Sequence, residues 1–419
     1  MDFLIGWFLI AAVLVGHGGL NVAIYNRLNA TAIRRSILKK MTKALLVWTI
    51  LFPILVWFLA SDFIADVFWH RPNSVPWLLG AYACVCLGSC VVLGVPWLVW
   101  RPLFGLEWVS AKTRVEVVEV QATTANRLAL SKKCKVARHL PWNQILELSI
   151  EESELPVRGL PAGLDGYRIA HLSDIHLTGD IHPDFARYAV LRANQWQPDL
   201  MALTGDIIDK QICIDWLGEI FSPVDCRDGC YFVLGNHDTR IVDSRQTREG
   251  MDRAGWTDLG GRALRLPLAG NIEGMLIGNE YPWYARPQIP TTPDSSFRIL
   301  LSHSPDQLWW ARQHHVSLML AGHMHGGQGR FPFVGPILGP SYHGSRFAAG
   351  DFYRTPTTMH VSRGLSGTHL LRLNCRPELS LLTLRAWPDD VERISTPESR
   401  SRQQPRHQKK DAHIEARWP

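Results

Sequence analysis

Three long apolar runs near the amino terminus constrain the fold of this chain more than any other feature of its sequence. They cover Phe3 to Tyr25, Ala44 to Ala60 and Trp77 to Trp100. Each is about as long as a helix that crosses a hydrocarbon core of roughly 30 Å. Because a helix satisfies its backbone N–H and C=O groups internally, it can cross lipid. The sequence therefore predicts a transmembrane region of three spans over residues 1–101.

The first run has a competing interpretation, because a secretory signal peptide also places an apolar stretch at the amino terminus. A signal peptide begins with positive charge, whereas this chain has Asp2 and no Lys or Arg before the run. A spanning helix is therefore favoured. His17 and Asn21 lie four residues apart within it, which predicts an interhelical hydrogen-bonding face. A transport or catalytic role for this pair is the alternative.

Cations beside the apolar runs predict the side of the membrane on which the remaining chain lies. Six stand between the first two runs, namely Arg27, Arg34, Arg35, Lys39, Lys40 and Lys43. Arg71 is the only one between the second and third runs. Since cytoplasmic loops carry the excess of Lys and Arg, the basic loop and everything after Trp100 are expected in the cytoplasm. The eight cysteines agree with a reducing compartment, because none stands in a Cys-x-x-Cys pair.

The two ends of the soluble region have simpler patterns. Residues 102–154 alternate β-branched and polar residues in short stretches and are predicted to be a linker with short strands. Residues 392–419 are rich in Arg, Gln, Ser, Glu and Lys, so a disordered basic tail is expected. The formal net charge of +6 is weak and its cations gather at two places. Nucleic acid is therefore not expected as a partner.

Between residues 155 and 391 a short apolar run ends five times in a polar cluster. The runs are Tyr167 to Leu172, Leu200 to Leu203, Tyr231 to Leu234, Phe297 to Leu301 and Ser317 to Leu320. Such runs predict buried strands, and Pro183 to Gln195 and Ser244 to Ala254 are expected as connecting helices. Because functional groups collect at strand ends in layered α/β folds, the five loops are expected to converge on one site.

The clusters after these strands combine carboxylate, imidazole and amide groups. In chain order they are Asp174-Ile175-His176, Gly205-Asp206-Ile207-Ile208-Asp209, Gly235-Asn236-His237-Asp238, Ser302-His303-Ser304 and Gly322-His323-Met324-His325-Gly326. A single Asp-x-His pair arises often by chance, but five such clusters, each directly after a predicted strand, do not. Nitrogen and oxygen donors without thiolates suit Mn, Fe or Zn.

In this order and spacing the five clusters resemble the calcineurin-like metallophosphoesterase superfamily. The string Gly322 to Gln328, with Ser362-Arg363-Gly364 and Asn374 to Glu378, is similar to its bacterial membrane-associated phosphodiesterase subgroup. The resemblance covers Leu155 to Leu384 and leaves out the apolar runs and the tail. It implies an α/β fold, a four-layer α-β-β-α sandwich over residues 155–391, here preceded by a bundle of about three transmembrane helices.

The resemblance also implies a site for two divalent metal ions. Asp174, His176 and His325 would hold one ion, whereas Asn236, His303 and His323 would hold the other, with Asp206 between them. A metal-bridging hydroxide would attack phosphorus. His237 would act on the leaving oxygen, with Asp209 as its orienting partner. A helix amino-terminal carboxylate is the alternative for Asp209, and Arg330, His343 and Arg363 are candidates for phosphate contact.

Two functions are compatible with these residues. The first is hydrolysis of a phosphodiester, pyrophosphate or phosphomonoester, and tethering to a membrane adds lipid-linked esters to the candidate substrates. The alternative is a membrane-anchored sensor or scaffold that binds metal or nucleotide without turnover. An intact His237 favours the enzyme, because a binding module has no need of an acid.

Overall fold

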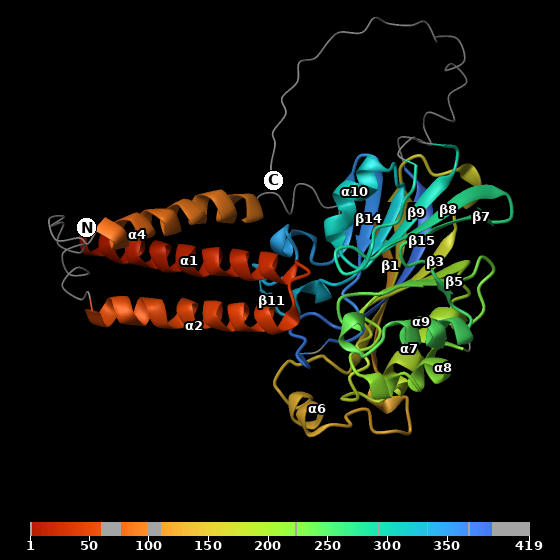
Figure 1. The fold of residues 1–419 in the computed structure, drawn as a ribbon, viewed down its shortest axis with the longest axis horizontal. Helices are drawn as coiled ribbons and strands as arrows, with labels where there is room; N and C mark the ends of the chain where they lie inside the picture. Colours follow the sequence, from red (N-terminus) through yellow and green to blue (C-terminus); the bar gives the residue numbers. More distant parts are fainter. Residues whose placement is uncertain are drawn as a thin grey trace, which may run out of the picture.

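A computed structural model describes residues 2–59, 77–98, 110–222, 224–290, 294–332, 334–367 and 369–387. A bundle of helices projects from a two-sheet domain (Figure 1). The predicted tail, 392–419, and the connection that carries Arg71 lie outside the described residues.

The bundle contains three candidate membrane spans. Its helices are α1 (Asp2–Asn29), α2 (Arg35–Leu59) and α4 (Trp77–Ser89), and α4 continues through a π-helical turn, Cys90–Gly94. The segments Leu4–Asn29, Arg35–Phe58 and Trp77–Leu98 are long and apolar enough to cross a membrane. At Gly16, where α1 packs on α4, a Cβ atom would lie 2.0 Å from the carbonyl oxygen of Cys86. Glycine therefore permits the close approach of the two helices.

One member of the polar pair in α1, His17, joins all three helices. His17 Nδ1 lies 2.6 Å from the hydroxyl of Tyr82 in α4, and its Nε2 lies 3.2 Å from the carbonyl oxygen of Thr49 in α2. Asn21 donates to the carbonyl oxygen of His17 over 2.8 Å. Both side chains are buried. The predicted interhelical hydrogen bonds are confirmed at His17, whereas the Asn21 side chain bonds to His17 within α1.

Two sheets form the domain. In the seven-stranded sheet the order is β1 (Ala111–Glu119), β2 (Glu147–Val157), β15 (Glu378–Ala386), β3 (Arg168–Leu172), β4 (Leu200–Thr204), β5 (Cys230–Val233) and β6 (Thr257–Asp258). In the six-stranded sheet it is β13 (Gly350–Arg354), β14 (Thr357–Val361), β10 (Leu318–Ala321), β9 (Phe297–Ser302), β8 (Ile272–Asn279) and β7 (Ala263–Leu268). A small hairpin pairs β11 (Arg330–Phe331) with β12 (Gly335–Pro336).

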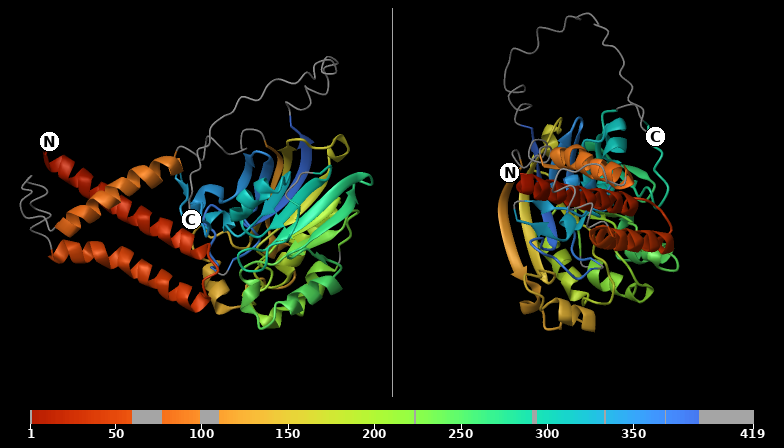
Figure 2. Two further views of the ribbon diagram at one scale, coloured as in Figure 1. Left: turned by 45° about the horizontal axis from the view of Figure 1, so that its top comes forward. Right: turned by 90° about the vertical axis from the view of Figure 1, so that its left-hand side faces the viewer.

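Helices cover the outer faces of both sheets, so the domain has four layers. The seven-stranded sheet carries α7 (Asp184–Gln195), α8 (Trp216–Phe221) and α9 (Arg245–Arg253), and the six-stranded sheet carries α10 (Leu308–Gln313) (Figures 1 and 2). Buried residues of both sheets, among them Ile169, Leu200, Ile299 and Leu320, pack together between them. Each such side chain stabilises the fold by about 1.5–3 kcal/mol. The predicted α-β-β-α sandwich is confirmed.

The segment predicted as a linker, 102–154, contributes strands to the seven-stranded sheet. β1 pairs antiparallel with β2, which in turn pairs parallel with β15. β15 also pairs antiparallel with β3. The last strand of the described chain therefore lies between β2 and β3, and the sheet begins within the segment that was predicted as a linker with short strands. A short helix, α6 (Lys132–Ala137), lies between β1 and β2.

The bundle docks on a loop that follows the last of the five polar clusters. Asn26, near the end of α1, donates to the carbonyl oxygen of Ile337 over 3.1 Å and accepts from the backbone N–H of Gly339 over 2.9 Å. Trp97, in the third candidate span, donates to Ser345 Oγ over 2.9 Å. Two candidate spans thus hold residues 337–345, close in sequence to His323 and His325.

Candidate metal centre

The structure brings together all nine residues predicted for the site. They follow β3, β4 and β5, which are parallel neighbours in one sheet, and β9 and β10, which are parallel neighbours in the other. Donor atoms lie within 4.8 Å of one another in three groups: Asp174, His176, Asp206 and His325; His176, Asp209 and His237; Asp206, His303 and His323. Asn236 Oδ1 joins the last group, 3.1 Å from His303 Nε2.

The first group is arranged around His176. Its Nε2 lies 3.2 Å from His325 Nε2 and 3.5 Å from Asp206 Oδ2. Asp174 Oδ1 lies 3.4 Å from His325 Nε2 and 3.8 Å from His176 Nε2. Two carboxylates and two imidazoles therefore present one donor atom each to a common space.

The second group is arranged around His303. Its Nε2 lies 3.0 Å from His323 Nδ1 and 3.3 Å from Asp206 Oδ2. Asp206 Oδ2 therefore faces both groups, because the same atom lies near His176. This is the position in which a carboxylate can hold two ions at once.

An orphaned oxygen in the first group tests whether a cation fits. Asp174 Oδ1, which faces the ring nitrogens of His176 and His325, is buried and has no hydrogen-bond partner within the described part of the chain. A buried polar atom without a partner costs about 1–3 kcal/mol. In addition, two imidazole nitrogens that face each other can share only one proton, whereas a cation can accept both lone pairs. The donor set therefore fits divalent ions of the nitrogen- and oxygen-binding kind.

The electrostatics of the site also favour positive charge. Burial lowers the pKa of His176, but Asp209 and Asp174 outweigh it and raise the pKa to about 10. Burial lowers the pKa of His303 as well, and Asp206 raises it to about 9. The carboxylates thus create a negative potential at the donor atoms.

The backbone holds most donor positions in a conformation that is costly for side chains. The φ angles of Asp174, His176, Asp206, His323 and His325 are 52°, 50°, 54°, 70° and 49°. Left-handed backbone costs roughly 1–2 kcal/mol at each such residue, and clusters of this kind occur at functional sites. Gly322 allows the last loop to approach the first, since a Cβ there would lie 1.8 Å from Ser173 Oγ.

Asp209 contacts more than the partner that the sequence suggested. The predicted contact with His237 is present, at 2.5 Å between Oδ1 and Nδ1. Its Oδ2 also lies 2.7 Å from His176 Nδ1, and Arg240 donates to Oδ1 over 2.6 Å. Burial lowers the pKa of His237 to about 4, against the opposing effect of Asp206. His237 is therefore neutral at neutral pH in the free site.

Three residues that sequence reasoning missed support the loops. Arg240 Nη2 also contacts His237 Nε2. Asp238 accepts from the backbone N–H groups of Ile207 and Ile208 through one oxygen and from that of Gly235 through the other, so it joins two of the loops. Both residues stand within three positions of His237 in the sequence, and this proximity was the available signal.

Arg372 is the third missed residue, and no motif marks it. It is fully buried and donates to the carbonyl oxygens of His325, over 3.1 Å, and Arg363, over 2.8 Å. The three phosphate-contact candidates have other surroundings. The Arg363 guanidinium pairs with Glu151 and Glu378, His343 packs edge-on against Phe347, and Arg330 lines a separate hollow.

Known proteins share these sequence features. The sequence profile of the family described as calcineurin-like phosphoesterase matches residues 167–327. The "uncharacterized metallophosphoesterase YkuE" of Bacillus subtilis (strain 168) is 32% identical over 255 residues, which cover 57% of this chain and 86% of that protein. Phosphodiesterase YaeI of Escherichia coli (strain K12) is 29% identical over 223 residues, which cover 52% of this chain and 82% of that protein. A "transmembrane protein with metallophosphoesterase domain" of Danio rerio is 27% identical over 287 residues, with 61% and 63% covered. The chain therefore belongs to the calcineurin-like metallophosphoesterase family.

Proposed function

We propose that this chain is a membrane-anchored phosphoesterase with two divalent metal ions, and that a phosphodiester is its preferred kind of substrate. The observation that carries the proposal is the pair of donor groups that share Asp206 Oδ2 and lie beside His237. A relative named as a phosphodiesterase supports the diester over a monoester or a pyrophosphate.

The proposed roles follow the two groups. Asp174, His176 and His325 hold one ion, Asn236, His303 and His323 hold the other, and Asp206 lies between them. When bound, two such ions make hydroxide available near neutral pH and withdraw charge from phosphoryl oxygens. Mn, Fe and Zn all suit this donor set.

His237, Asp209 and Arg240 act on the substrate in this proposal. Arg240 binds a phosphoryl oxygen, because a guanidinium donates two parallel hydrogen bonds to phosphate. His237 donates a proton from Nε2 to the leaving oxygen, while Nδ1 is fixed by Asp209. The negative charge of a bound phosphate beside Nε2 raises the pKa of His237 from its low value in the free site.

Metal removal tests the proposal. Chelation should abolish hydrolysis of a chromogenic phosphodiester, and manganese should restore it. Asp206→Asn removes the charge shared by both groups, so it should lower the bound metal content and reduce turnover by at least about 100-fold. Asp243→Asn, on an exposed loop, is the control variant and should keep the metal content and turnover of the unchanged protein. Metal binding with no turnover of diesters, monoesters or pyrophosphates would instead favour the sensor or scaffold.

We further propose that the three candidate spans cross the membrane and that the catalytic domain is cytoplasmic. The end of α1 and the start of α2 lie on the side of the bundle that meets the domain (Figure 1). The cations between these helices are therefore on the same side as the metal centre, which the positive-inside rule assigns to the cytoplasm. A reporter enzyme that works only in the cytoplasm should be active when it is fused after Trp100. A reporter that works only outside the cytoplasm should be inactive at the same position. Periplasmic or extracellular activity would refute the orientation.

Docking of the bundle on residues 337–345 supports a substrate at the membrane surface, including lipid-linked esters. The purified protein should deplete such a species from a membrane extract, as measured by mass spectrometry, and Asp206→Asn should not. Depletion of water-soluble esters alone would contradict the lipid-linked substrate.

A further inference from the structure

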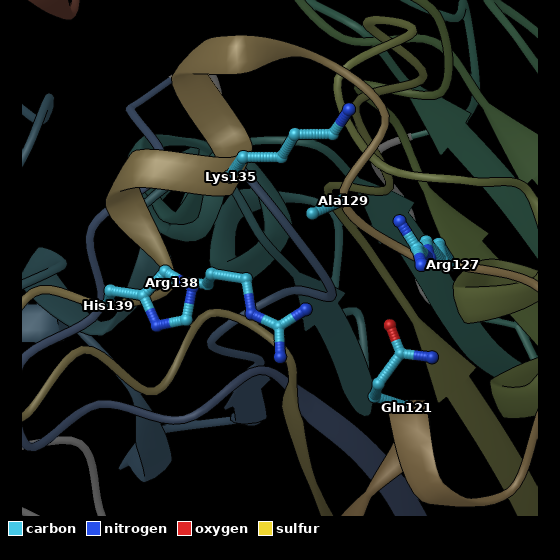
Figure 3. Close-up of a pocket in the computed structure, with 6 residues that line it drawn as sticks. All are labelled: Gln121, Arg127, Ala129, Lys135, Arg138 and His139. Atoms are coloured by element: carbon cyan, nitrogen blue, oxygen red, sulfur yellow. The ribbon is translucent and has the colours of Figure 1, made fainter.

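A basic hollow lies in the connection between β1 and β2, apart from the metal centre. It has a volume of about 470 Å³ and is lined by Gln121, Arg127, Ala129, Lys135, Arg138 and His139 (Figure 3). Arg127, Lys135 and Arg138 have no carboxylate within ion-pair distance among the residues that the structure describes. Three such cations around one space create a positive potential that attracts an anion.

The same segment exposes large apolar side chains next to its cations. Trp142 is 84% exposed, Val136 67% and Leu140 46%. Basic residues beside exposed Trp and aliphatic side chains are the composition of segments that lie in the headgroup layer of a membrane. Trp in particular prefers that layer, because its ring is apolar and its N–H needs a polar partner.

The segment lies on the side of the domain from which the bundle projects. In Figures 1 and 2, α6 is beside the end of the bundle that meets the domain. Charges at the start of α2 and in α6 also affect side chains near the bundle. Burial lowers the pKa of Arg240, and Arg35 at the start of α2 lowers it further. Burial also lowers the pKa of His369, and Lys133 in α6 and Arg240 lower it further. The basic segment and the start of α2 therefore flank the same part of the surface.

The segment is fixed to the loops of the metal centre. Asn143 donates to the carbonyl oxygens of Ala137 and Leu370, each over 2.8 Å. The backbone N–H of Arg372 donates to Asn143 Oδ1 over 2.8 Å. Because Arg372 in turn contacts the carbonyl oxygen of His325, the position of the segment is set by the same framework that sets the donor loops.

We propose that this hollow binds the phosphate-bearing headgroup of an anionic phospholipid in the leaflet nearest the domain, with Val136, Leu140 and Trp142 in the headgroup layer. The proposal rests on the bundle crossing the membrane and not on hydrolysis. Its charge complementarity is direct, since three unpaired cations face an anionic group. The domain would then be held against the membrane at a second point, separate from residues 337–345.

Hydrogen exchange of the full chain in lipid nanodiscs tests this proposal. Backbone amides of residues 127–143 should exchange more slowly in discs of phosphatidylcholine with phosphatidylglycerol than in discs of phosphatidylcholine alone. Each cation near an anionic surface changes the binding equilibrium about fivefold. In the double variant Lys135→Gln, Arg138→Gln, protection in discs with phosphatidylglycerol should therefore fall about 25-fold. Exchange should then be equal in the two kinds of disc. Trp142→Ala should reduce protection in both discs.

Two controls separate this site from general charge effects and from soluble phosphate. Arg253→Gln removes an exposed cation at the end of α9, away from the bundle, and should leave the exchange of residues 127–143 unchanged. In detergent, glycerol phosphate should give no protection. Equal protection by glycerol phosphate, or equal exchange of the unchanged protein in both discs, would overturn the proposal. Neither readout depends on catalysis, so a failure here is distinguishable from a failure of the proposed hydrolysis.

Discussion

Replacing Asp209 by Asn should weaken metal binding as well as turnover. One carboxylate oxygen contacts His237 and Arg240, and the other contacts His176 over 2.7 Å. Asn has only one oxygen, and it should face the two donors. Its NH2 group then meets the ring N–H of His176, so that contact is lost. A hydrogen bond to a charged group contributes about 1.5–3 kcal/mol, which corresponds to roughly a 10- to 100-fold loss of metal affinity, as found for partners of metal-binding histidines.

Calorimetric titration of the metal-free variant with manganese measures this loss directly. The manganese dependence of diester hydrolysis should shift by the same factor, and turnover at saturating manganese should fall less than in His237→Ala. Asp243→Asn is the matched control, because that carboxylate pairs with Arg245 alone among the described side chains and lies on an exposed loop. Unchanged manganese affinity in Asp209→Asn would refute the link between Asp209 and His176.

Two further predictions concern the acid and an ion pair remote from it. His237→Ala should keep both ions and slow turnover by about 10²–10⁴-fold. Turnover should slow less for a nitrophenolate leaving group than for an alkoxide. Equal slowing for both leaving groups would contradict the acid role. Burial raises the pKa of Glu151, but Arg363 and Lys112 hold it at about 2. A lowered pKa in the folded state stabilises the protein above about pH 4.5, and this contribution disappears as the pH falls toward 2. Glu151→Gln should therefore lower the free energy of unfolding, measured in urea, by about 3 kcal/mol at pH 7. The free energy of unfolding of this variant should also fall less steeply below pH 4.5 than that of the unchanged protein. The control Glu273→Gln, in an exposed ion pair, should lower the free energy of unfolding by under about 1 kcal/mol.

Local sequence patterns predicted the elements that carry the site. The run Leu200 to Leu203 corresponds to β4 (Leu200–Thr204), and the expected helix Ser244 to Ala254 corresponds to α9 (Arg245–Arg253). These agree because a buried strand and an amphipathic helix each depend on residues close together in the sequence. The donor residues follow the strands directly, so their convergence was predictable from their position at strand ends.

Contacts between distant segments were not predictable in the same way. β15 pairs with β2 and β3, more than 200 residues earlier, and nothing in its own sequence names those partners. Arg372 contacts the carbonyl oxygens of His325 and Arg363, and backbone carbonyls leave no trace in a sequence pattern. The placement of β1 and β2 in the sheet was missed for the same reason, since alternation in Glu147–Val157 indicates a strand but not its neighbours.

The left-handed backbone at Asp174, His176, Asp206, His323 and His325 sets stability against activity in this family member. Glycine at any of these positions would relieve a steric clash between Cβ and the following carbonyl oxygen while it removed a donor. Selection for thermal stability alone would therefore favour variants that fold better and bind no metal. Directed evolution of this chain for robustness needs an activity screen at every round, because glycine at these positions removes side chains on which hydrolysis is proposed to depend.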